Sequence, residues 1–112
     1  MVDAHKITEQ TSLLSHRLYA EVIDEDHRYI GQARALLEQR LENGQATIGE
    51  QHWQQLLQRP WTEIRQHMLE DTAAGRLLRS NSPFSFIIGI SDPDVRRQLW
   101  RQAKNELSAA TT

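Results

Sequence analysis

Five histidines and the carboxylates near them are the side chains whose types fit acid–base or metal chemistry. The histidines are His5, His16, His27, His52 and His67. Asp24 lies three residues before His27, and Glu63 and Asp71 lie four residues to either side of His67. These spacings place each set on one helix face, whereas a metal site needs ligands that converge from several elements. Neither H-E-x-x-H nor the Glu-x-x-His pairs of di-iron bundles occurs, so we predict ion pairs, no metal and no cofactor.

The acidic triplet 24–26 beside His27 is a second acid–base candidate. Crowded carboxylates assist proton transfer when they are buried together, but such clusters are usually solvated helix caps. The five glycines are scattered, and the chain contains neither a G-x-S-x-G motif nor a glycine-rich phosphate loop. We therefore predict that the protein is not an enzyme, and we assign no catalytic residue.

The composition excludes several other kinds of site. The 112 residues include no cysteine, which excludes disulfides, thiolate metal sites and cysteine nucleophiles. The formal net charge of −2 gives no compositional case for nucleic acid or anionic membranes. This charge is unevenly distributed, because residues 1–58 carry five basic and nine acidic side chains while residues 59–112 carry eight and six. No apolar run reaches the roughly 18 residues that span a bilayer, so we expect a cytoplasmic protein with no membrane partner.

Apolar spacing predicts helices in the first half of the chain. Leucine, valine and isoleucine recur at helical intervals over residues 8–23. A second stripe over residues 30–41 ends at Asn43-Gly44, a C-terminal helix signal. The acidic triplet 24–26 between them either caps a new helix or lies on the solvent face of one continuous helix.

Two further helices are expected to meet at Pro60. A T-x-x-E capping box at Thr47 and Glu50 begins the first, which must end near Gln58 because of the proline. The second is expected to run from 61 to 74 and to end at Gly75. The apolar residues expected on the inward faces of the pair are Ile48, Trp53, Leu56, Leu57, Trp61, Ile64, Met68 and Ala73.

Residues 77–90 have two interpretations. The alternation of Phe84, Phe86 and the isoleucines that follow favours a strand, paired with residues 77–79 in a short β-hairpin. Alternatively, Ser82 caps a short buried helix that has Pro83 in its first turn.

The last helix is predicted to begin at Ser91-Asp92-Pro93-Asp94, which supplies a cap, a proline and a first-turn carboxylate. The expected fold is therefore mainly α: a compact bundle of four to five helices, with the hairpin at about 77–90 as an open alternative. We expect one domain over residues 1–112, with frayed ends at 1–7 and 108–112.

Without catalytic motifs, the sequence favours a protein that acts by binding. Trp and Arg are enriched at interface hot spots, and this chain has three tryptophans and only Lys6 and Lys104 as lysines among its basic residues. We predict a small regulatory or adaptor-type protein, of the antitoxin, immunity or accessory kind, that binds a protein partner or self-associates. The expected contact residues are Trp61, Phe84, Phe86, Arg97, Trp100 and Arg101.

The alternative is a DNA-binding winged helix–turn–helix built from residues 47–90. Two helices around Pro60 followed by a hairpin have the element order of that motif. The residues expected to contact bases are Thr62, Arg65 and Gln66, and those expected to contact phosphates are Arg76 and Arg79. Residues 47–90 carry four arginines and four carboxylates, which is unfavourable because phosphate neutralisation requires a basic excess.

Overall fold

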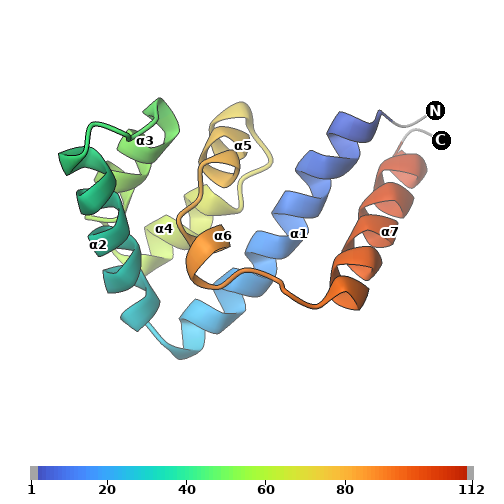
Figure 1. The fold of residues 1–112 in the computed structure, drawn as a ribbon. Coiled ribbons are helices and arrows are strands. Elements are labelled where there is room, and N and C mark those ends of the chain that lie inside the picture. Colours follow the sequence, from blue (N-terminus) through green and yellow to red (C-terminus); the bar gives the residue numbers. More distant parts are fainter. Residues whose placement is uncertain (1–2, 111–112) are drawn as a thin grey trace.

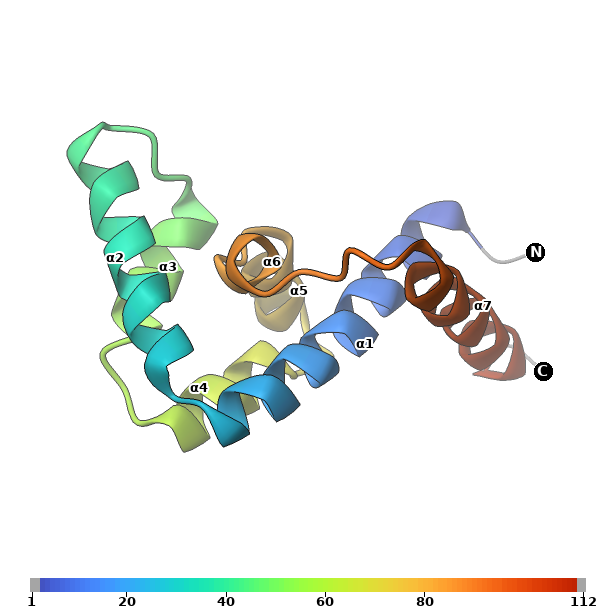
Figure 2. The same ribbon diagram turned by 60° about the horizontal axis from the view of Figure 1, so that its bottom comes forward.

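Helix α1 (Ala4–Glu25) is the element on which the others are arranged, and it packs against α2, α5 and α7 (Figures 1 and 2). The computed structural model describes residues 3–110, and these form seven helices and no strand. The remaining helices are α2 (Arg28–Glu42), α3 (Ile48–Leu56), α4 (Trp61–Met68), α5 (Ala73–Ser80), α6 (Phe84–Ile87) and α7 (Pro93–Ala110). The predicted mainly α class is confirmed, but there are more helices than four to five. The hairpin at about 77–90 is wrong, because α5 and α6 occupy that segment.

The acidic triplet divides α1 from α2. Asp24 and Glu25 are the last two residues of α1, and Asp26 leaves the helical conformation. The Asp26 Oδ1 atom then accepts a hydrogen bond from the Arg28 N–H at 3.0 Å, at the start of α2. Of the two interpretations of this triplet, the cap is therefore confirmed at Asp26.

Most described residues of the two segments expected to fray are helical. Helix α1 already begins at Ala4, where the Asp3 carboxylate accepts from the His5 N–H at 2.9 Å. Helix α7 continues to Ala110. The expected fraying of residues 1–2 and 111–112 concerns residues outside the described part of the chain.

Trp53 lies at the centre of the larger hydrophobic core. Its indole Nε1 donates to the Leu78 carbonyl at 2.6 Å, and its ring meets the Phe84 ring edge to face at a centroid distance of 5.5 Å. These contacts fix α5 and the start of α6 against α3. The other fully buried members of this core are Ala20, Ile23, Ala33, Leu37, Leu57, Ile64 and Met68.

The capping box that begins α3 is present as predicted. Thr47 Oγ1 accepts from the Glu50 N–H at 3.1 Å, and the Glu50 carboxylate accepts from the Thr47 N–H at 3.2 Å. Ile48, expected in the core, is instead 70% exposed. At 100° per residue Ile48 lies about half a turn away from the buried Leu57, so the two cannot share a face.

The expected single helix over residues 61–74 is wrong, because α4 ends at Met68 and α5 begins at Ala73. Thr72 causes the restart, since its Oγ1 accepts from the Gly75 N–H at 3.1 Å. Gly75 therefore lies in the first turn of α5 and ends no helix. A Cβ atom there would lie 2.1 Å from the Glu70 carbonyl oxygen, so the close approach of the α4–α5 loop requires glycine.

Of the two interpretations of residues 77–90, the short helix capped by Ser82 is confirmed as α6. The Ser82 hydroxyl accepts from the Phe84 N–H at 3.2 Å, and the backbone turns at Gly89, whose φ is +61°. Two residues span about 200° of a helix, so Phe84 and Phe86 point to opposite sides, whereas a strand would place them on one face.

Helix α7 packs along α1 in the opposite direction, at one end of the molecule (Figures 1 and 2). As predicted, its start is capped by Asp92, whose Oδ1 accepts from the Asp94 N–H at 2.9 Å. The contact between the two helices is a second, smaller hydrophobic cluster formed by Ile7, Leu14, Leu99 and Ala103.

Candidate functional site

Three of the expected partner contacts occupy different environments. Phe84 is completely buried, so it has no surface to offer a partner. Trp61 is half-buried, and its Nε1 donates to Asp24 Oδ1 at 2.7 Å, which joins α4 to the end of α1. Phe86, in contrast, is 84% exposed.

The remaining three contacts, Arg97, Trp100 and Arg101, are all exposed on α7. Residues three or four positions apart lie on one side of a helix, so Arg97, Trp100, Arg101 and Lys104 form one surface. We call these four residues the α7 face. The Trp100 side chain is 41% exposed, and its indole N–H has no hydrogen-bond partner in the described part of the chain.

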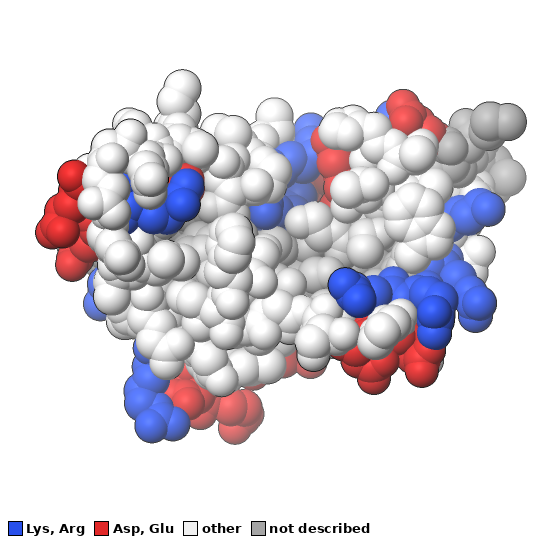
Figure 3. Space-filling view, in the orientation of Figure 1, with Lys and Arg blue, Asp and Glu red and all other residues white. Residues whose placement is uncertain are grey.

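The charge of α7 is opposite in sign to that of the whole chain. The helix carries four cations and two carboxylates, in a protein of net charge −2. Asp94 pairs with Arg97, and Glu106 accepts from the amides of Gln10 and Gln102. Figure 3 shows the lysine and arginine side chains gathered over this helix. Of the four cations on α7, Arg96, Arg101 and Lys104 have no ion-pair partner among residues 3–110.

A hollow of about 400 Å³ lies beside Phe86. Arg40 and Glu50 form an ion pair in its wall, with Arg40 Nη2 2.9 Å from Glu50 Oε1. Arg40 thereby holds the pKa of the Glu50 carboxyl below its usual range. The other lining residues are Leu36, Ser80, Asn81, Ser82, Pro83 and Ser85, so the wall has little net charge.

The residues expected to bind DNA do not form one basic surface. Thr62 and Gln66 are exposed on α4, but Arg65 lies 3.4 Å from Asp24. Arg76 is engaged with carboxylates, and Arg79 is only 4% exposed and cannot reach a phosphate on a duplex. The wing is also missing, because residues 77–90 form no hairpin.

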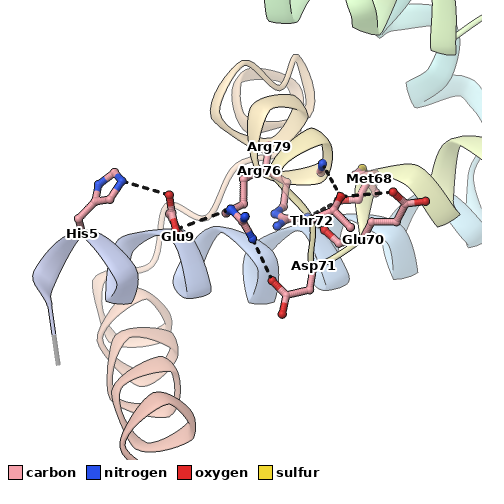
Figure 4. A network of polar contacts seen from close by, with 9 residues as sticks. His5, Glu9, Met68, Glu70, Asp71, Thr72, Arg76 and Arg79 are labelled. Atoms are coloured by element: carbon pink, nitrogen blue, oxygen red, sulfur yellow. Dashed lines mark hydrogen bonds and ion pairs between the residues drawn. The ribbon is translucent and has the colours of Figure 1, made fainter. Parts of the chain in front are cut away.

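The cleft between α1 and α5 holds a network of charged side chains (Figure 4). Glu9 lies 3.1 Å from His5 Nε2 and 4.0 Å from Arg76 Nε, and Arg76 Nη1 lies 3.4 Å from Asp71. Arg79 extends from the same side of α5, and its Nη1 donates to the carbonyls of Met68 and Glu70 at 2.9 and 2.7 Å. Arg79 thus caps the C-terminus of α4, a role that no local pattern in the sequence indicates.

His16 is the one predicted chemical candidate that is buried among residues 3–110. Its Nδ1 lies 2.7 Å from the Ser12 carbonyl oxygen, so this nitrogen carries the proton in the neutral ring. Burial, with a smaller contribution from the charge of Arg79, lowers the pKa of His16 to about 4. His16 is therefore neutral near pH 7.

The other histidines and carboxylates form surface pairs. His67 lies 3.2 Å from Glu70, and Glu63 lies 2.7 Å from Arg59. Asp24 binds Trp61 and Arg65, while hydrogen bonds from Arg28 lower the pKa of Asp26 to about 2. Within residues 3–110 no three metal-ligating side chains come together.

Comparison of the chain with protein-family models, with curated proteins and with solved structures gives no match. Within the described residues, no helix has the length and apolar character needed to cross a bilayer.

Proposed function

We propose that the protein is a small regulatory or adaptor-type component that acts by binding another protein through the α7 face. The observation that carries the proposal is the exposed Trp100 ring between Arg97, Arg101 and Lys104. Tryptophan and arginine are enriched among the few residues that dominate the binding free energy of protein interfaces, because they combine a large apolar area with polar groups.

The charges of α7 indicate the chemistry of the partner. Arg96, Arg101 and Lys104 lack an ion-pair partner within the described chain, so they are available to carboxylates of another molecule. Complementary charges at an interface steer association and select the partner. The expected partner segment therefore has an apolar side chain for Trp100, flanked by aspartate or glutamate.

A protein partner fits the whole molecule better than a nucleic acid does. A duplex extends beyond a single helix, and its phosphates would then meet a protein whose net charge is −2. An acidic peptide segment can instead be confined to α7.

Phe86 is proposed as a second contact. Its ring is almost fully in water beside the hollow of about 400 Å³, and burying a phenylalanine side chain is worth about 1.5–3 kcal/mol. A partner that covers α6 would recover this free energy.

A selection experiment tests the proposal without knowledge of the natural partner. Random peptides displayed on phage are selected on the full chain, in parallel with a pool of random DNA duplexes. Binding of the enriched peptides is then compared between the wild type, the triple variant Arg97→Gln/Trp100→Ala/Arg101→Gln, and the control variant Gln98→Ala/Asn105→Ala.

We expect enriched peptides that combine carboxylates with an apolar residue and that bind the triple variant at least about tenfold more weakly. The control variant should bind them as the wild type does. Enrichment of duplexes alone, or peptides that bind the triple variant equally well, would overturn the proposal.

A further inference from the structure

We infer that the cleft between α1 and α5 is a binding site for a small organic carboxylate, with Arg79 as the residue that receives the carboxylate group. This site is separate from the α7 face. The observations that lead to it are the burial of Arg79, the free donors of its guanidinium group and the cavities on which it lies.

Arg79 is a buried cation without a counter-ion. Its side chain is only 4% exposed, and no carboxylate in the described chain lies within 4.0 Å of it. Burial lowers the pKa of Arg79 from its ordinary value, in keeping with the loss of hydration. Glu50, the buried carboxylate, has Arg40 as its partner. A buried charge is costly unless an opposite charge and hydrogen bonds compensate it.

The unused donors of Arg79 have the arrangement that a carboxylate requires. Nη1 is occupied by the carbonyls of Met68 and Glu70, but the buried Nε has no acceptor. Nη2 also has no hydrogen bond among the described residues and is not fully buried. Nε is closed to a water-sized probe, so a ligand carboxylate meets Nη2 first and completes the Nε–Nη2 fork when the side chains around Nε shift slightly. Arg28 uses the same two atoms to bind Asp26, at 2.9 and 2.8 Å.

The neighbouring carboxylates are already occupied. Glu9 is shared by His5 and Arg76, and Asp71 also pairs with Arg76 (Figure 4). Neither of them therefore neutralises Arg79 directly.

Two cavities adjoin Arg79, with volumes of about 470 and 480 Å³, and both include Glu9 and Arg76 in their walls. Volumes of this size are typical of sites for small organic molecules. Apart from His5, the charged lining comprises three cations and two carboxylates, so one negative charge on a ligand balances these five side chains. These five residues are Lys6, Glu9, Asp71, Arg76 and Arg79.

The rest of the first cavity suits an organic carboxylate. Ala73 and Leu77 supply apolar surface, and the Ser12 hydroxyl has no hydrogen-bond partner among residues 3–110. The Thr8 and Ser80 hydroxyls in the same wall already donate to backbone carbonyls. A ligand can therefore place its carboxylate at Arg79, accept from Ser12 and pack its apolar part against α5.

The test follows the Arg79 Nε–H signal by NMR in the full chain during titration with benzoate at constant ionic strength. Benzamide serves as the neutral isostere, and inorganic phosphate as the competing anion. Arg79→Lys keeps the charge and a donor for the α4 carbonyls but removes the fork, and its spectrum identifies the signal. Ser12→Ala is a second variant that preserves the α1 helix, and Ser91→Ala, outside both cavities, is its control.

We expect benzoate to move the Arg79 signal to saturation while benzamide leaves it in place. Arg79→Lys should weaken binding about tenfold or more, and Ser12→Ala several-fold, relative to Ser91→Ala. A signal that does not move with benzoate, an equal response to benzamide, or unchanged binding in Ser12→Ala would overturn the inference. Tighter binding of phosphate than of benzoate would contradict the assignment to a carboxylate.

Discussion

Phe84 and Phe86 belong to the same four-residue helix but have different surroundings. Phe84 packs against Trp53 in the larger core, whereas the Phe86 ring faces solvent beside the hollow of about 400 Å³. Variants of the two residues therefore distinguish what a buried aromatic ring contributes to stability from what an exposed ring contributes to binding.

We predict that Phe84→Ala lowers the free energy of unfolding by about 3–5 kcal/mol, because it leaves a cavity next to Trp53. Phe86→Ala, the matched control, should change it by no more than about 0.5 kcal/mol. Urea denaturation followed by circular dichroism measures both values. A comparable loss in the two variants would show that Phe86 is not on the surface.

His16 makes stability depend on pH in a defined direction. Its native pKa of about 4 is below the unfolded value of 6.5, so the unfolded chain binds the proton more strongly. The stabilising contribution is therefore fully present above about pH 6.5 and is lost as the pH falls to about 4.

We predict that His16 alone lowers the free energy of unfolding by about 3 kcal/mol over this range. Denaturation curves recorded between pH 7 and 4, at about half-unit steps, give the free energy of unfolding at each pH. This free energy should fall less in His16→Gln than in the wild type. His52→Gln, in which an exposed histidine is replaced, should retain the wild-type decrease. If the free energy of unfolding falls equally with pH in His16→Gln and the wild type, His16 does not cause this pH dependence.

At the scale of elements, Gly75 determines how α5 meets the end of α4. An added Cβ atom would collide with the Glu70 carbonyl oxygen, 2.1 Å away, whereas at Gly31 in α2 nothing lies within 4 Å. The two glycines are thus a matched pair, both within helices, that differ in the space around them.

Gly75→Ala is predicted to lower the free energy of unfolding by about 1–3 kcal/mol, since the loop and α5 must separate. Gly31→Ala should raise it by up to about 1 kcal/mol, because alanine favours a helix. Thermal and urea unfolding of the two variants measure these changes. Stabilisation by Gly75→Ala would mean that the loop does not approach α5 this closely.

The sequence predicts the elements best where a local signal exists. The capping box at Thr47 and Glu50 and the Asp92-Pro93 start of α7 are confirmed, because each requires only hydrogen bonds between near neighbours. The hairpin was wrong because alternation over 84–90 is equally compatible with a short helix that places one phenylalanine in the core. Long-range contacts decided between the two, among them the packing of Phe84 on Trp53.

The candidate sites also divide into those that local spacing determines and those that depend on long-range contacts. The grouping of Arg97, Trp100 and Arg101 follows from helical spacing alone, and all three are exposed. The burial of Arg79 depends on carbonyls 9 and 11 residues away at the end of another helix. No pattern of neighbouring residues indicates that contact, so the sequence suggested a surface phosphate ligand instead.

At the scale of the whole molecule, the small net charge of −2 conceals an uneven distribution. The helix α7, with four cations and two carboxylates, lies at one end and packs mainly on α1 (Figures 1 and 3). If the proposed acidic partner exists, we expect its attraction to this end of the molecule to weaken as salt increases.

The three tryptophans provide an internal control for the proposed contact. The indole N–H of Trp53 binds the Leu78 carbonyl, and that of Trp61 binds Asp24. The indole N–H of Trp100 has no such partner in the described residues and lies on the α7 face.

The measurement that most directly tests the proposed function is an NMR titration of these three indole signals with an acidic peptide from the selection. If the α7 face binds the partner, the Trp100 signal moves to saturation while the Trp53 and Trp61 signals stay in place. Movement of Trp53 or Trp61 with an unchanged Trp100 signal would contradict it.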